Sequence, residues 1–122
     1  MTDPGPDAPQ TRLASLYAAF NERDVPGLLA AMTPDVSWPN GWAGGVLHGR
    51  AEVGDYWRRQ WAEIDPTVTP TGFAVEPDGR IAVTVHQIVR DRAGSELANH
   101  TVTHVYRLAG GLVAEMEIRE RS

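Results

Sequence analysis

The chain has 122 residues, a length that suits one domain with a core of its own. Sixteen acidic and eleven basic residues give a net charge of −5, so we expect no nucleic-acid partner. Every basic residue is arginine and cysteine is absent, which excludes Schiff-base chemistry, disulfides and thiolate-bound metals. No apolar run approaches the ~20 residues of a membrane span, and the first residues lack the pattern of a signal peptide. We therefore expect a cytoplasmic protein with no membrane partner.

Residues 1–10 form a polar segment with three prolines, which we expect to be a disordered tail before one domain over residues 11–122. In the first half of this domain, apolar residues recur at the three- and four-residue spacing of helices. Three helices are predicted there, over residues 11–23, 26–32 and 50–64.

The second half of the chain changes to an alternation of apolar and polar residues, which is typical of strands. Four long strands are predicted, over residues 68–76, 80–91, 96–108 and 112–120. A short strand over 36–38 and a glycine-rich loop over 41–49 are expected between the last two helices. Helices followed by strands with glycine-containing turns indicate an α+β fold with an antiparallel meander.

Alternation also assigns the side chains of each strand to two faces of the sheet. The inner face is expected to carry the bulkier and more apolar sets, which include His100, Val102, His104, Tyr106, Leu112, Ala114, Met116, Ile118 and Glu120. The strand that starts at residue 80 places Gln87 among inward valines and His86 outside, although Ile88 interrupts that pattern. The outer face is expected to mix small and apolar side chains, namely those of Thr101, Thr103, Val105 and Val113.

Four segments carry a resemblance to a known family. They are residues 16–24 (LYAAFNERD), 32–36 (MTPDV), 48–53 (HGRAEV) and 105–113 (VYRLAGGLV). In this order they resemble the SnoaL-like branch of the nuclear transport factor 2-like superfamily. The resemblance implies a cone, in which a curved, mainly antiparallel sheet wraps around about three N-terminal helices and encloses a pocket. Members include polyketide cyclases, ketosteroid isomerases, dehydratases, an epoxide hydrolase and binding proteins, so the resemblance implies architecture more than reaction.

Two residues are candidates for catalysis. His104 resembles in position the oxyanion-hole aspartate of ketosteroid isomerase, and imidazole can donate a hydrogen bond or accept a proton near neutrality. Tyr17 resembles in location the isomerase tyrosine that donates to the substrate oxygen. Either side chain could equally be a packed core residue with its polar atoms satisfied. Trp38 precedes Pro39 where the isomerase carries its base, so isomerisation by that route is not expected.

A larger group is expected to line the pocket and contact the ligand. It consists of Trp38, Trp42, Trp57, Trp61, Gln87, His100, Val102, Tyr106, Met116, Ile118 and Glu120. Packing of the third helix on the sheet would explain Trp57 and Trp61 equally well. His100 and His104 would lie about 13 Å apart along a strand, so no metal site is expected.

Together these features predict a cofactor-free enzyme that uses His104 as general acid or base on a hydrophobic carbonyl compound. The reaction would be cyclisation, isomerisation or dehydration of a flat, polycyclic molecule with one or two oxygens. The alternative is a protein that binds a ligand in the same cavity without chemistry. Because members of the family often pair through the outer sheet face, a homodimer is expected.

Overall fold

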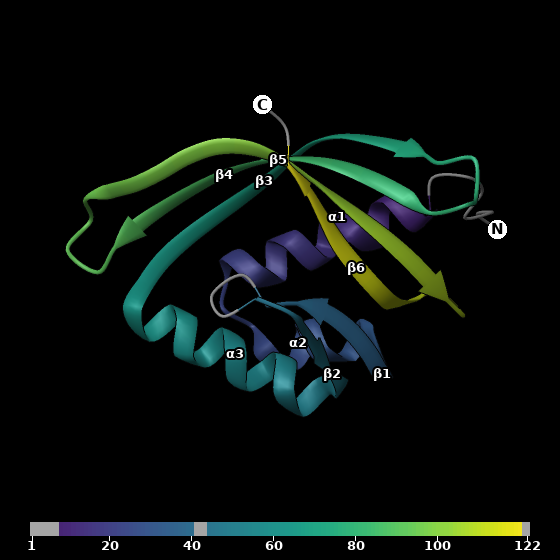
Figure 1. Ribbon diagram of the computed structural model, residues 1–122, viewed down its shortest axis with the longest axis horizontal. Helices are drawn as coiled ribbons and strands as arrows, with labels where there is room; N and C mark the ends of the chain where they lie inside the picture. Colours follow the sequence, from purple (N-terminus) through teal and green to yellow (C-terminus); the bar gives the residue numbers. More distant parts are fainter. Residues whose placement is uncertain (1–7, 41–43, 121–122) are drawn as a thin grey trace, which may run out of the picture.

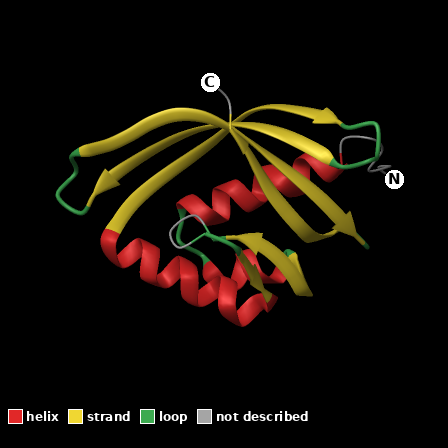
Figure 2. Cartoon of the chain, viewed as in Figure 1, coloured by secondary structure: helices red, strands yellow, loops and turns green. Residues whose placement is uncertain are grey.

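The protein is described by a computed structural model over residues 8–40 and 44–120. These residues form three helices and one curved sheet, with the helices on the concave side of the sheet (Figures 1 and 2). The helices are α1 (Ala8–Asn21), α2 (Val25–Ala30) and α3 (Gly49–Glu63). This arrangement confirms the predicted α+β cone. None of the helices in the described ranges has the length and apolarity that crossing a bilayer requires.

The sheet has six strands in the order β2-β1-β6-β5-β4-β3. Their bounds are β1 (Met32–Pro39), β2 (Val46–His48), β3 (Ile64–Val75), β4 (Ile81–Asp91), β5 (Glu96–Ala109) and β6 (Leu112–Glu120). Neighbouring strands are antiparallel except β1 and β6, which are parallel. The sheet is therefore mixed, and its parallel pair joins the N-terminal and C-terminal halves of the chain.

Several element boundaries differ from those predicted. The first helix begins at Ala8, inside the expected tail. Met32 was expected to end a helix, but strand β1 begins there. Met32 belongs to a strand because it pairs with Val113 of β6. That partner is distant in sequence, so local spacing could not reveal it. Strand β2, which lies in the expected glycine loop, pairs its His48 with Ser37.

Strand β3 starts at Ile64 and continues through Pro66 and Pro70, although Asp65-Pro66 was expected to end a helix. Proline is tolerated because β3 is an outer strand with one hydrogen-bonded neighbour, β4. On its free side, the amide of Asn21 at the end of α1 donates to the Val68 carbonyl (2.8 Å) and accepts from the Val68 N–H (3.0 Å). These two bonds attach α1 to the edge of the sheet.

The side-chain faces of β5 follow the predicted alternation, but those at the start of β6 do not. The register shifts between Arg107 and Leu108, so that Leu108 pairs with Val113. Val113 was expected on the outer face, and it is instead part of the core. The irregularity leaves one extra residue in β6 between these two pairs. Toward the start of β6, the residues that point inward are therefore those that were expected to point outward.

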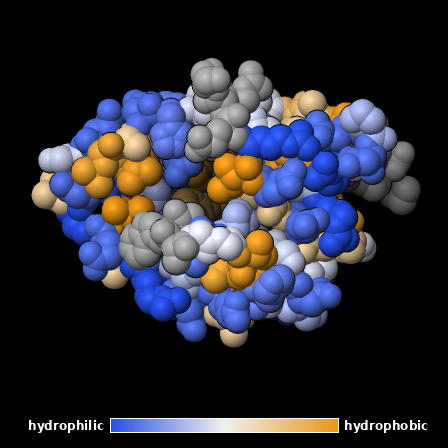
Figure 3. Space-filling view, in the orientation of Figure 1, coloured by the Kyte–Doolittle hydropathy of each residue, from blue (hydrophilic) through white to orange (hydrophobic). Residues whose placement is uncertain are grey.

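The outer face of the sheet carries charge as well as small residues. Glu117 lies opposite Val105 and Arg119 opposite Thr103, so these four share that face. Arg80 forms an ion pair with Glu117 at 3.1 Å. Val105 lies on the same face but is only 1% exposed to solvent. The view in Figure 3 shows polar side chains over much of the molecule, with apolar patches and a hollow near the middle.

Candidate active site

A pocket lies between the concave face of the sheet and the helices α1 and α3. Eight of the predicted site residues line it: Tyr17, Trp38, Trp57, Gln87, His104, Tyr106, Met116 and Ile118. Six further residues complete the lining: Leu16, Phe20, Pro39, Tyr56, Gln60 and Val68. No lining residue in the described part of the chain is aspartate, glutamate or arginine. The pocket is therefore an uncharged site.

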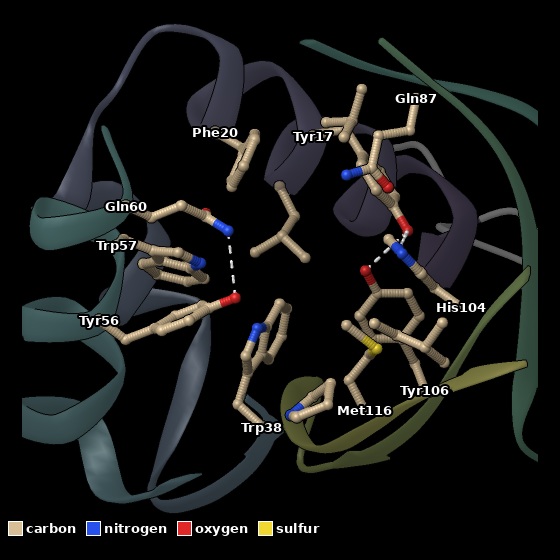
Figure 4. A pocket seen from close by; sticks show the side chains of 14 residues that line it. Tyr17, Phe20, Trp38, Tyr56, Trp57, Gln60, Gln87, His104, Tyr106 and Met116 are labelled. Carbon is tan, nitrogen blue, oxygen red and sulfur yellow. Dashed lines mark hydrogen bonds between the residues drawn. The ribbon is translucent and has the colours of Figure 1, made fainter. Parts of the chain in front are cut away.

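One end of the pocket holds a chain of three hydrogen-bonded side chains (Figure 4). The hydroxyl of Tyr106 on β5 donates to the Tyr17 oxygen on α1 at 2.7 Å. The Tyr17 hydroxyl lies 2.9 Å from Nδ1 of His104, which is two residues before Tyr106 on the same strand face. A helix and a strand thus bring both predicted catalytic residues together.

The order of donors in this chain and the tautomer of His104 depend on each other. The tautomer of His104 sets whether Tyr17 donates to Nδ1 or accepts from it, and the Tyr17 proton is available for Nδ1 when its oxygen accepts from Tyr106. A neutral imidazole that accepts at Nδ1 carries its proton on Nε2. No partner in the described residues occupies Nε2, and His104 lines the cavity. In that tautomer His104 offers an N–H donor to a ligand.

Burial shifts the pKa values of all three groups toward their neutral forms. It lowers the pKa of His104 to about 4, because the charged imidazolium loses its hydration. Burial, together with the neighbouring Tyr106, raises the pKa of Tyr17, and burial raises the pKa of Tyr106. Near pH 7 the three groups are uncharged, so His104 is not a source of imidazolium.

Aromatic rings form the walls between the two ends of the pocket. The ring centroids of Trp38 and Trp57 are 5.3 Å apart, and Phe20 meets Trp57 edge to face at 6.2 Å. This packing leaves a cavity of about 90 Å³. Pockets that enclose drug-sized ligands measure roughly 300–1,000 Å³, so a polycyclic molecule exceeds the space between these rings. The pocket is open to solvent beside Ile118, which is 42% exposed.

Helix α3 adds a polar pair on the opposite wall (Figure 4). The amide Nε2 of Gln60 donates to the Tyr56 hydroxyl at 3.1 Å. Neither Tyr56 nor Gln60 is among the lining residues expected from the sequence. A signal was present, because Gln60 lies one turn after Tyr56 in a stripe that is otherwise apolar.

The remaining predicted residues lie elsewhere. Trp61 packs against Phe20 at 5.2 Å and beneath the Arg23 guanidinium, outside the lining. Val102 is in the core and does not line the pocket. His100 is exposed near the start of β5.

Three other predictions concern positions beyond the pocket. His86 lies on the outer face as predicted, where Nε2 is 2.6 Å from Oδ1 of Asn99. Trp42 and the side chain of Glu120 lie outside the described residues. Within the described ranges, no three histidine, aspartate or glutamate side chains gather as a metal site.

The comparisons with known proteins agree with this geometry. The model of a family described as the SnoaL-like domain matches residues 13–116. The chain belongs to this SnoaL-like family. No curated protein matches the SnoaL-like chain by sequence.

Solved structures share the cone of this SnoaL-like protein. An NTF2-like protein of unknown function from Burkholderia pseudomallei is 29% identical, with a TM-score of 0.80 over 93% of this chain and 90% of that one. TerC, co-crystallised with polyporic acid, is 25% identical, with a TM-score of 0.79 over 93% and 91%. RV0760c from Mycobacterium tuberculosis, in complex with estradiol-17β-hemisuccinate, is 22% identical, with a TM-score of 0.77 over 89% and 90%.

Proposed function

We propose that this SnoaL-like protein is a cofactor-free enzyme that polarises the carbonyl oxygen of a hydrophobic compound. The observation that carries the proposal is the convergence of Tyr106, Tyr17 and His104 at one end of an apolar pocket. Electrostatic catalysis needs a donor whose direction is fixed before the substrate binds, and the two tyrosines would fix that of His104.

His104 is the residue that would act on the substrate. Its Nε2–H donates to the carbonyl oxygen, and this bond strengthens as negative charge develops on that oxygen. Tyr17 and Tyr106 lie behind His104 and hold the imidazole in the donating tautomer. Of the general acid or base roles expected from the sequence, this proposal keeps the donor role, with Nδ1 bonded to Tyr17 and the proton on Nε2.

The same assignment favours one reaction over the others. Isomerisation and dehydration need a base that removes a proton from carbon, and the described lining offers no carboxylate for that step. Cyclisation can start from the enol that a β-dicarbonyl substrate forms without a base from the protein: the electron pair of its C=C bond attacks the polarised carbonyl carbon of the same molecule, and the enol proton passes through water to the carbonyl oxygen. The electron pair of the carbonyl bond then moves to the oxygen that His104 holds. We therefore propose an intramolecular ring closure.

Related structures support a small organic molecule as the ligand. TerC and RV0760c were each solved with a small organic molecule, polyporic acid and estradiol-17β-hemisuccinate respectively. A carbonyl or hydroxyl group on an otherwise apolar body matches the lining of the present pocket, which combines aromatic walls with few polar groups.

The carbonyl carbon of acetophenone, labelled with ¹³C, tests the donor role of His104. In the complex with the wild-type protein, its resonance should stay near the value seen in water, where the oxygen accepts hydrogen bonds. In His104→Leu it should move upfield toward the value in an apolar solvent. His86→Leu is the matched control, since His86 lies on the outer face. Equal resonances in wild-type and His104→Leu complexes would exclude the donor role.

A non-catalytic binding protein is the second candidate. The lack of any charged group in the described lining favours it, because such a pocket can hold a neutral ligand without activating a nucleophile. Incubation with linear poly-β-ketone substrates, followed by mass spectrometry and NMR of the recovered compound, separates the two. A ring-closed product, formed faster with wild-type than with His104→Leu, supports the enzyme.

We further propose a homodimer through the outer face of the sheet. Small side chains line a depression there, including Gly72, Ala82, Thr84 and Thr103. The Thr103 hydroxyl is enclosed and has no hydrogen-bond partner among the described residues. The ion pairs on this face would then border the contact.

A further inference from the structure

The wall of the pocket opposite His104 has a hydrogen-bonding function of its own. Tyr56 is 8% exposed, and Gln60 beside it is half-buried, so both belong to the pocket and not to the outer surface of α3. The bond from Gln60 Nε2 to the Tyr56 hydroxyl fixes the orientation of the amide. An oriented amide still has one N–H donor and a carbonyl acceptor for a ligand.

The space between the two polar ends suits a single ring. Phe20 and Trp38 lie between Gln60 on one side and His104 on the other, and Trp57 lies on the same wall as Gln60 (Figure 4). The cavity of about 90 Å³ is smaller than the roughly 150 Å³ that holds benzene in an apolar protein core. One ring therefore enters with part of its body in the open mouth, and a second fused ring would have to displace aromatic side chains.

The electrostatics of the lining exclude charged groups on the ligand. No described lining residue carries a charge near pH 7, because burial holds His104 in its neutral form. Burying an ion without a partner costs far more than burying a neutral polar group. The whole chain is also acidic, with a net charge of −5.

We propose that the Tyr56–Gln60 pair is a second polar subsite, which selects a neutral compound no larger than one ring, open-chain before the proposed closure, with a carbonyl at one end and a hydroxyl or second carbonyl at the other. This inference rests on the proposed function, in which His104 binds the first carbonyl. Gln60 would accept from, or donate to, the second oxygen. The subsite determines which substrates bind and does not take part in the chemistry.

Binding of matched probes tests the subsite. Acetophenone has a carbonyl only, 3- and 4-hydroxyacetophenone add a hydroxyl, and 4-acetylbenzoate adds a carboxylate. Calorimetric titration of the wild-type protein should give at least one hydroxyacetophenone a Kd about tenfold below that of acetophenone, as one added hydrogen bond allows. The carboxylate probe should bind more weakly than acetophenone.

Two variants test whether the preference for a hydroxyacetophenone over acetophenone depends on Gln60. Gln60→Leu should abolish this preference, so that the Kd values of acetophenone and the hydroxyacetophenone become similar while acetophenone still binds. Gln10→Leu makes the same exchange on α1 away from the pocket and should preserve the preference. A ratio near one in the wild type, or a tenfold ratio that survives Gln60→Leu, overturns the subsite and leaves the role of His104 intact. Failure of acetophenone to bind the wild type overturns both proposals.

Discussion

The hydroxyl of Tyr106 donates to the hydroxyl of Tyr17 across 2.7 Å, although the two residues are 89 positions apart in the chain. Tyr106 contributes to the pocket wall, but it is only 1% exposed, and its hydroxyl is bonded to Tyr17, which is bonded to His104. Its effect on the site passes through Tyr17, which makes Tyr106 a positioning residue.

Replacing Tyr106 with phenylalanine should allow His104 to populate both of its neutral tautomers. Without the Tyr106 proton, the Tyr17 oxygen can accept from His104, and the Nδ1–H form becomes accessible. Two-dimensional ¹⁵N–¹H NMR of the imidazole should show a single Nε2–H form in the wild type and a mixture in Tyr106→Phe. Tyr56→Phe removes a pocket hydroxyl that is not bonded to His104 and should leave the spectrum unchanged. A wild-type spectrum with the proton on Nδ1 would contradict the assigned donor order.

The stability of the fold should fall as the pH drops from about 6.5 to about 4. The unfolded chain binds a proton at His104 near its ordinary pKa of about 6.5, whereas the folded protein resists protonation until its pKa of about 4. Between these values the unfolded state binds more protons, so the free energy of unfolding decreases with falling pH. The full loss is of the order of 3 kcal/mol, at about 1.4 kcal/mol per pKa unit.

Urea denaturation at several pH values isolates this contribution from that of the carboxylates. The difference in unfolding free energy between wild type and His104→Gln should change across the window from pH 6.5 to 4 and be constant above it. The same difference for His86→Gln should change little, since His86 is not in the core. A flat difference for His104→Gln would mean that the imidazole is hydrated in the folded protein.

The sequence predicted the site best where a regular alternation runs along a long strand. His104 and Tyr106 were placed inward because β5 keeps its period of two over this stretch. Alternation failed at Val113, because the shift in register after Arg107 depends on how two strands meet. Gln60 was missed for a different reason: it is polar, and the residues expected from α3 were the apolar ones.

Light scattering should report twice the 13.3 kDa mass of one chain if the outer face forms the proposed dimer. Thr84→Arg would fill the depression beside Thr103 and should yield the monomer mass without loss of the fold. Glu63→Arg adds the same side chain at the exposed end of α3 and should keep the dimer. A wild-type mass of one chain at tens of micromolar would rule out this interface.

Asn21→Ala should destabilise the protein by about 2 kcal/mol. The substitution removes two hydrogen bonds and leaves the N–H and C=O of Val68 without their partner in a partly buried position. Asn99→Ala removes an exposed bond to His86 and should cost less than about 1 kcal/mol. Thermal unfolding followed by circular dichroism compares the two variants. Equal losses would show that the Asn21 bonds are no stronger than surface contacts.

The contact between Asn21 and Val68 also affects whether another chain can add a strand to the edge of the sheet at β3. An outer strand normally presents a row of free N–H and C=O groups on which another chain can add a strand and start to aggregate. Along β3, the groups that point away from β4 belong to residues 66, 68 and 70, since every second residue faces the same way. Pro66 and Pro70 have no N–H to offer, and the Pro66 carbonyl accepts from Arg23. With Val68 already bound, none of these three positions has a free N–H, so residues 66–70 of this edge are a poor template for strand addition by a neighbouring molecule.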